Sequence, residues 1–352
     1  MATPLLKVEN LNIAFTGYGR RNHVLKDVGF EIAAGERVAL IGETGSGKSV
    51  TSKAILGTLP DNAVIESGDI AYRGASVFAM PPREREGLKG TAFSIIMQDP
   101  LSSFNPVFKV GRLLDDVLYY ADRRNAVVSS AAERRKRIFD VLRRVQLADP
   151  ERIFAAWPNE LSGGMRQRVL IALSLLHQPE LLIADEPGTA LDVTTQDEIL
   201  KLINRLVDDE GLSLLMITHN LGVVRQTADR VLVMRHGEIV EQGTLSEVFT
   251  QPKEAYTRDL MDAVPPLYGP RVVNQPASAK APIVTLENVD KVYQAKGLLF
   301  SRGPGHHAAK SVNLAVAEGE VFGLAGESGS GKTTVARMVM RLVKPTSGTI
   351  RV

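Results

Sequence analysis

The chain has 352 residues, of which 44% are hydrophobic and 23% charged, a size and composition that predict a globular protein of two domains. Its formal net charge of +2 gives no broad electrostatic case for a nucleic-acid partner. Because it contains no cysteine, disulfides, thiolate zinc sites and iron–sulfur clusters are excluded.

Membrane insertion is not expected from the sequence. The first residues, Met1–Lys7, show neither the charged start nor the apolar stretch of a signal peptide. The most apolar segment, Val169–Leu176, is much too short to cross a bilayer. If the protein works at a membrane, we expect it to bind there through a partner.

The first elements predict a phosphate-binding loop. Residues 5–15 alternate like a half-buried strand, residues 38–41 form a short apolar strand, and residues 50–59 resemble a helix. Between this second strand and the helix, Gly42-Glu-Thr-Gly-Ser-Gly-Lys-Ser49 has two glycines separated by four residues, then Lys and Ser. Strand, loop and helix in this order are the context that a P-loop requires.

Each residue type in this loop has a physical role. Glycines let backbone N–H groups approach phosphate closely, and the helix that follows adds its positive end. Lys48 would neutralise phosphate charge and the Ser49 hydroxyl would ligate Mg²⁺. The predicted nucleotide-binding residues of this loop are Gly42, Glu43, Thr44, Gly45, Ser46, Gly47, Lys48, Ser49 and Val50.

The middle of the chain predicts an inserted helical region and a second glycine-rich helix start. Residues 110–145 carry helical periodicity with many charges. Ser162, Gly163 and Gly164 then open the apolar helix at 169–176. This could be a second phosphate-binding N-terminus or only a helix cap.

Two short apolar runs, residues 181–184 and 214–217, predict parallel strands that are buried on both faces. The first run ends in Asp185-Glu186, where one carboxylate could hold Mg²⁺ and the other polarise an attacking water. A polar turn is the alternative, which the P-loop upstream makes less favoured. Residues 230–240 predict two further strands around a turn.

The last third of the chain repeats the first. A Pro-rich stretch at 264–282 predicts a linker between a complete domain at 4–263 and the start of a second copy at 283–352. A second P-loop and helix start lie in this copy, with Thr333 as its magnesium ligand. Its predicted nucleotide-binding residues are Gly326, Gly329, Ser330, Gly331, Lys332, Thr333 and Thr334.

The P-loop, then Leu161-Ser-Gly-Gly, then Asp185-Glu186, resembles the arrangement of the ATP-binding cassette ATPases. The resemblance implies an α/β P-loop nucleoside triphosphate hydrolase fold. It also implies an antiparallel β subdomain, a helical subdomain and a partial second copy at the C-terminus. The implied ligands are ATP and Mg²⁺.

The resemblance also assigns roles to single residues. Glu186 is the implied general base and Asp185 a metal residue, while Gln98 matches the Q-loop glutamine, which contacts Mg²⁺ and the water. His219 matches the switch histidine that holds the γ-phosphate. Further matches are Asp192 in the D-loop and the adenine-stacking aromatics Phe15 and Tyr293, although Phe15 could equally be a core residue of its strand. Gly188 stands where the family usually has Thr or Ser, a change expected to loosen the turn before Asp192.

Within the family, Gln98-Asp-Pro-Leu-Ser-Ser-Phe-Asn-Pro106 and the tail around Tyr256-Thr257 resemble the dipeptide, oligopeptide and nickel importers. The implied partners are transmembrane permease subunits, an extracytoplasmic solute-binding protein and a second cassette, at the cytoplasmic face of the inner membrane. Two other functions stay open: a truncated nucleotide-binding product without transport, and a soluble tandem protein acting on ribosomes or DNA.

In this family two cassettes close head to tail, so that each ATP lies between one P-loop and the opposite signature. The signature at Ser162–Gly164 would then serve the nucleotide on Lys332, and the Lys48 site would need a signature from elsewhere. These 352 residues contain neither composite site in full, so the chain alone is expected to bind ATP and hydrolyse it poorly.

Overall fold

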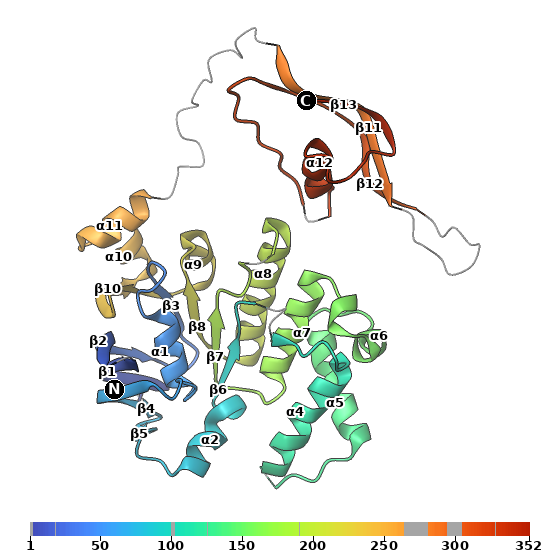
Figure 1. The fold of residues 1–352 in the computed structure, drawn as a ribbon. Coiled ribbons are helices and arrows are strands. Elements are labelled where there is room, and N and C mark those ends of the chain that lie inside the picture. The colour runs from blue at the N-terminus through green and yellow to red at the C-terminus, as the bar shows by residue number, and fades with distance from the viewer. Residues whose placement is uncertain are drawn as a thin grey trace. The chain divides into compact units, whose positions relative to one another are not determined.

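A computed structural model describes residues 3–17, 19–99, 103–124, 126–189, 191–263, 281–293, 305–327 and 329–352. The chain divides into two compact units, one of residues 1–191 and 195–265 and the other of residues 192–194 and 266–352, and each is described by itself (Figure 1). Most of the predicted linker, residues 264–280, lies outside the described residues.

A six-stranded sheet forms the centre of the larger unit, in the order β10-β9-β3-β8-β7-β6. Its inner strands are parallel, and only the pair β9 and β10 is antiparallel. The bounds are β3 (Arg37–Ile41), β6 (Phe93–Ile96), β7 (Leu181–Asp185), β8 (Ser213–Thr218), β9 (Arg230–Arg235) and β10 (Glu238–Thr244).

These parallel strands form because their apolar runs are buried on both faces. Successive residues of β7 alternate between two hydrophobic clusters, Leu182 and Ala184 packing in one and Leu181 and Ile183 in the other. All four side chains are fully buried. The sequence predicted these strands correctly from the same runs.

The second layer is an antiparallel sheet with the order β2-β1-β4-β5. Residues 5–15 were predicted to form a strand, and β1 does so with β2 on one edge and β4 on the other. The bounds are β1 (Leu6–Gly17), β2 (Arg20–Ile32), β4 (Ala63–Tyr72) and β5 (Ala75–Ser76).

A helical part follows β6, as the periodicity of residues 110–145 predicted. Ser130 caps one of its helices with a capping box to Glu133, and Arg137 of that helix pairs with Asp122 of the helix before it. The helices of this region are α4 (Val110–Arg124), α5 (Ala131–Arg144), α6 (Pro150–Ala155), the short 3₁₀ helix Pro158–Glu160, and α7 (Gly163–Leu175), whereas α2 (Pro82–Thr91) precedes β6.

The remaining helices of the larger unit are α1 (Lys48–Ile55), α8 (Val193–Glu210), α9 (Leu221–Thr227), α10 (Leu245–Thr250) and α11 (Ala255–Asp262). The helix predicted at 50–59 was placed wrongly, because α1 begins two residues earlier and ends at Ile55. Gly47 starts it from a left-handed conformation, and Gly57, at φ +62°, stops it.

The smaller unit repeats the opening of the larger one. Its three-stranded sheet has the order β12-β11-β13, so that β11 has a neighbour on each side, as β1 has. Gly348 takes φ +86° at the place where Gly68 takes φ +90° in β4. The bounds are β11 (Pro282–Tyr293), β12 (His306–Ala317), α12 (Lys332–Val339) and β13 (Ser347–Arg351).

One element of the larger unit has no counterpart in this repeat. β3 lies between β8 and β9, whereas residues 321–325, at the equivalent place, are not a strand and leave Val321 96% exposed. The described residues of the smaller unit provide no counterparts of β8 and β9. An apolar run needs such partners to become a buried strand.

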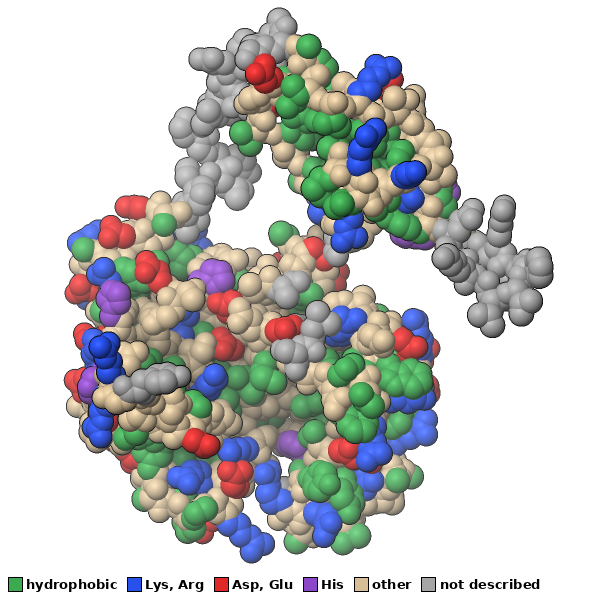
Figure 2. All heavy atoms as spheres, in the orientation of Figure 1, with side chains coloured by type: hydrophobic (Ala, Val, Ile, Leu, Met, Phe, Trp, Pro, Cys, Tyr) green, Lys and Arg blue, Asp and Glu red, His purple; other side chains and the backbone are tan. Residues whose placement is uncertain are grey.

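Charged side chains of both signs are interspersed on the face shown in Figure 2, and hydrophobic side chains gather over the helical part of the larger unit. In the described part of the chain, none of the helices has the length and apolar character needed to span a bilayer. Exposed hydrophobic residues of the helical part include Val107, Phe108, Tyr120, Val128 and Trp157.

Candidate functional site

The P-loop connects the end of β3 to the start of α1, and its shape depends on glycine. Gly42 has φ +150°, and a Cβ placed there would lie 2.1 Å from the carbonyl oxygen of Met234 in β9. Gly47 has φ +114° and a Cβ there would lie 2.8 Å from both Leu25 and Met234 side chains. No side chain fits at these two positions without movement, so the loop passes close to β9.

Lys48 holds the loop together from the inside. Its Nζ donates to the carbonyl oxygens of Gly42 at 2.7 Å and Glu43 at 2.8 Å, and its side chain is buried. Burial lowers the pKa of Lys48, against the opposing charges of Glu186 and Asp185. The ammonium group therefore lies enclosed beside two carboxylates.

The loop leaves backbone donors unused. Within the part of the chain that the structure describes, the N–H groups of Gly45, Gly47, Lys48 and Ser49 have no acceptor from the protein. The last two belong to the first turn of α1, where helix geometry leaves N–H groups free and the helix dipole is positive. This set of donors, with the lysine beside it, fits a polyphosphate.

The Glu186 carboxylate contacts three polar side chains beside the loop. Gln98 Nε2 donates to Glu186 Oε2 at 2.8 Å, and His219 Nδ1 lies 2.6 Å from Oε1. The Thr189 hydroxyl also donates to Oε2 at 3.1 Å. Gln98, which follows β6, and His219, which follows β8, thus meet on one carboxylate together with Thr189 of the same turn. The resemblance assigned Gln98 to Mg²⁺ and the water and His219 to the γ-phosphate, and those roles stay predictions.

The backbone of Glu186 is fixed as firmly as its side chain. Its φ is +48°, in the left-handed region that side chains other than glycine rarely adopt. Its N–H donates to the carbonyl of Ile217 in β8 at 2.8 Å. The residue directly after β7 is therefore held by the neighbouring strand, which directs its carboxylate to the polar cluster.

Asp185, the last residue of β7, is the candidate metal residue. Burial raises the pKa of Asp185, aided by the charge of Glu186 and opposed by the Ser49 hydroxyl and by Lys48. A half-buried carboxylate next to a hydroxyl supplies the oxygen donors that Mg²⁺ prefers. The residues present fit a magnesium ion whose other ligands would come from phosphate and water.

The signature residues lie at the start of α7, where Ser162 Oγ accepts a hydrogen bond from Met165 N at 3.3 Å. Ser162 and Gly163 are exposed, and among the described residues no hydrogen bond joins them to Lys48 or Glu186. In this structure the serine acts as a helix cap, which was one of its two predicted roles.

The remaining predicted residues are less informative. Phe15 in β1 lies opposite Asn22 and Ala63 and is half-buried against the core, and Tyr293 ends β11 with 41% exposure. Their stacking on adenine stays a prediction, as does the D-loop role of Asp192.

The second P-loop repeats the internal bonds of the first. Lys332 Nζ donates to the carbonyls of Gly326 at 2.7 Å and Glu327 at 2.6 Å. Gly326, Gly329 and Gly331 take φ values of +153°, +83° and +95°. Thr333 is exposed, whereas Thr334 is half-buried. The sequence similarity of the two loops therefore extends to the conformation of their glycines and to the bonds of their lysines.

Sequence reasoning missed three features. Thr189 contacts Glu186, and its place three residues later in the same turn was the only signal. Tyr256 contacts the P-loop from helix α11, although it lies more than 200 residues along the chain. Gly188 is buried, and a Cβ there would lie 2.7 Å from Cγ of Gln196, so this glutamine fills the space beside the glycine.

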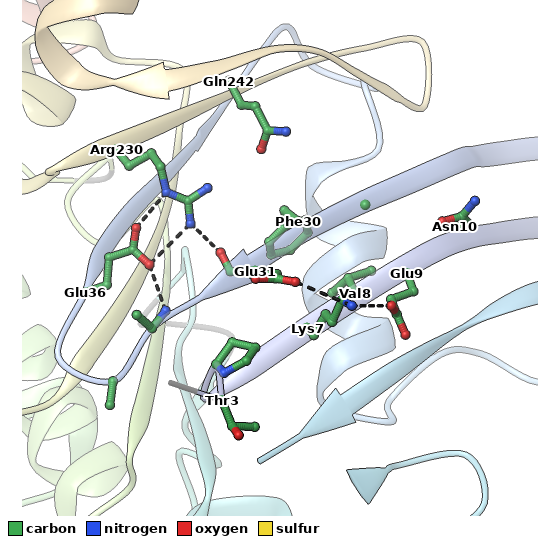
Figure 3. A pocket seen from close by; sticks show the side chains of 14 residues that line it. Thr3, Lys7, Val8, Glu9, Asn10, Phe30, Glu31, Glu36, Arg230 and Gln242 are labelled. Carbon is green, nitrogen blue, oxygen red and sulfur yellow. Dashed lines mark hydrogen bonds and ion pairs between the residues drawn. The ribbon is translucent and has the colours of Figure 1, made fainter. Parts of the chain in front are cut away.

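A hollow of about 710 Å³ lies elsewhere, at the outer edge of the antiparallel sheet (Figure 3). Its charged side chains bind one another: Arg230 Nε donates to Glu36 at 2.6 Å, and Lys7 pairs with Glu9 and Glu31. The arginine also donates to the Glu31 carbonyl. These pairs satisfy the charged groups of Arg230, Glu36 and Lys7 in the hollow.

The parallel sheet and the P-loop define a P-loop nucleoside triphosphatase fold. The antiparallel β subdomain and the helical subdomain that were predicted are both present. The family model described as "ABC transporter" matches residues 25–189 and 309–352. The chain therefore belongs to the ABC transporter family, as its motifs indicated.

Known relatives agree with this assignment. The chain is 42% identical to "Peptidoglycan transport ATP-binding protein YejF" of Agrobacterium fabrum, a match that covers 97% of this chain and 61% of that protein. It is 36% identical to "Glutathione import ATP-binding protein GsiA" of Escherichia coli, covering 98% of this chain and 59% of that protein. The chain thus spans about three fifths of the length of these relatives.

A solved structure shares the fold. The dimeric ATP-binding cassette MJ0796, in a post-hydrolysis state with ADP and phosphate, matches with a TM-score of 0.60 and 27% sequence identity. The match covers 68% of this chain and 98% of that one. The cassette fold predicted for the chain is thereby confirmed.

Proposed function

We propose that the chain binds and hydrolyses ATP and that this hydrolysis powers a membrane importer of peptides or similar small solutes. The observation that carries the proposal is the meeting of Gln98, His219 and Thr189 on Glu186, beside a P-loop with free donors. A carboxylate that is fixed in this way can orient a water and accept its proton. We expect it to face the γ-phosphate of a nucleotide on the P-loop, because its charge acts on the buried Lys48 of that loop.

Each group then has a task. The free N–H groups of the P-loop and Lys48 bind the phosphates, for which Lys48 exchanges its bonds to the loop carbonyls. Glu186 takes the proton of the attacking water, while Gln98 and His219 orient water and phosphate. Ser49, Asp185 and Gln98 would hold Mg²⁺, which supplies charge neutralisation at the phosphates.

The partners follow from the relatives. YejF and GsiA carry transport and import in their names, which supports permease subunits and an extracytoplasmic solute-binding protein as partners of this chain. The dimeric neighbour supports pairing with a second cassette, in which Ser162–Gly164 would face the nucleotide of the opposite P-loop. Such a protein would work at the cytoplasmic face of the inner membrane.

The test is peptide uptake in cells whose own copy of the gene carries Glu186→Gln. Uptake of a labelled dipeptide should fall to background, because the amide has nearly the size and shape of the carboxylate and cannot accept a proton. Glu84→Gln, an exposed residue of α2, is the matched control and should leave uptake unchanged. Normal peptide uptake in the Glu186→Gln cells, at equal protein level, would contradict the proposal.

A further inference from the structure

The segment after β10 folds back and is fixed at its start. The Glu241 carboxylate accepts the backbone N–H groups of Lys253 at 2.8 Å and Glu254 at 3.1 Å. Burial alone would raise the pKa of Glu241, but the hydrogen bonds outweigh the effect of burial, so that the pKa is lowered. Helix α11 therefore begins at a defined place beside the central sheet (Figure 1).

Tyr256 is the second residue of α11, and its ring is held firmly. It is 6% exposed and packs in the main hydrophobic core, while Thr257 beside it is fully buried. The guanidinium of Arg235, the last residue of β9, lies 4.6 Å from the ring centroid. A buried aromatic ring fixed in this way usually finds a partner for its hydroxyl.

That partner is the phosphate-binding loop. The Tyr256 hydroxyl accepts a hydrogen bond from the backbone N–H of Glu43 at 3.1 Å, and the carbonyl of Glu43 accepts one from Lys48. One loop residue is thus held on one side by helix α11 and on the other by the phosphate-binding lysine. Burial raises the pKa of Tyr256, so that the phenol stays neutral at physiological pH.

We propose that Tyr256 is a positioning residue of the P-loop, through which helix α11 sets how tightly the loop binds nucleotide. The inference rests on the proposed function of the loop as an ATP site. Because Lys332 makes the same internal bonds in the second loop, the tyrosine is not needed to form the loop. It restrains the Glu43 peptide while Lys48 moves from the loop carbonyls to phosphate.

The test compares the Tyr256→Phe/Lys332→Ala double variant with the Lys332→Ala single variant. The Lys332→Ala change leaves Lys48 as the one P-loop lysine. Tyr256→Phe keeps the ring and removes one hydrogen bond, so we expect Mg·ATP to bind about three- to tenfold more weakly. The melting temperature of the nucleotide-free protein should change little. Tyr120→Phe, on an exposed tyrosine of α4, should change neither quantity.

A merely structural role gives another pattern, namely a lower melting temperature with unchanged ATP affinity, and this would overturn the inference. If the background protein fails to bind ATP at all, the proposed function fails as well. If it binds ATP and Tyr256→Phe binds equally well, only the inference fails.

Hydrogen exchange tests the same link without changing the tyrosine. Saturating Mg·ATP should slow amide exchange in residues 255–262 of the Lys332→Ala protein, because the loop and α11 share the Tyr256 bond. Exchange in α6, which makes no hydrogen bond to the P-loop in the described part of the chain, should not change. An equal exchange rate of residues 255–262 with and without ATP would overturn the inference.

Discussion

Replacing Gly42 with alanine tests how far the P-loop depends on its contact with β9. The new Cβ would lie 2.1 Å from the Met234 carbonyl oxygen, whereas real Cβ atoms stay at least 3.0 Å away, so the loop must move by about 0.9 Å. Backbone strain and overpacking together should destabilise the larger unit by about 3 kcal/mol or more. The Gly42 carbonyl would move too, and with it the position of Lys48.

Gly45→Ala is the matched control in the same loop. Gly45 has φ +84° but nothing within 4 Å of a built Cβ, so only backbone strain of about 1 kcal/mol is expected. With a urea dependence of about 3 kcal/mol per molar, the unfolding midpoint should fall by about 1 M for Gly42→Ala and about 0.3 M for Gly45→Ala.

The assay is urea unfolding followed by tryptophan fluorescence, together with ATP binding. The chain has one tryptophan, Trp157, which lies in the larger unit and therefore reports on that unit alone. Gly42→Ala should also bind ATP more than about tenfold more weakly, the effect of losing about 1.4 kcal/mol of binding. Equal midpoints and equal ATP affinities for the two variants would refute the steric reasoning.

Three further predictions concern the carboxylates and the signature. Glu186→Gln should bind ATP but release phosphate about a hundredfold more slowly, as measured by a phosphate assay, and an unchanged rate would contradict its role as base. Asp185→Asn should raise the melting temperature at about pH 7.5. Because burial raises the pKa of Asp185, its contribution to stability is present at low pH and is lost as the pH rises through that pKa, so the gain should vanish near pH 4. A gain that is equal at both pH values would count against this. Ser162→Ala should cost about 1 kcal/mol in urea unfolding through loss of the cap on Met165 N, and no change would show that the cap is not stabilising.

The central strands and the P-loop were predictable because local sequence determines them. Apolar runs such as residues 181–184 are typical of strands that are buried on both faces of a parallel sheet, and they form β7 and its neighbours. The two P-loops share a glycine pattern, and their φ values agree closely, as for Gly42 and Gly326. A positive φ at these positions requires glycine, so the glycine pattern indicates the loop conformation directly.

Features that depend on distant partners could not be predicted. The run at 321–325 resembles β3, but it has no neighbouring strands among the described residues and stays irregular. The hydrogen bond between Tyr256 and Glu43 joins residues far apart, and no local pattern announces it. The resemblance gave Gln98 and His219 separate roles but did not indicate that they meet on Glu186, because the left-handed backbone that directs this carboxylate cannot be read from the sequence.

The most direct test of the account is the equilibrium binding of Mg·ATP to the Lys332→Ala protein and to the Lys48→Ala/Lys332→Ala double variant. Lys48 makes the bonds that hold the loop and lies beside both carboxylates. The account predicts one ATP per chain in the first protein and none in the second, with both folded by tryptophan fluorescence. Undiminished ATP binding by the double variant would contradict it.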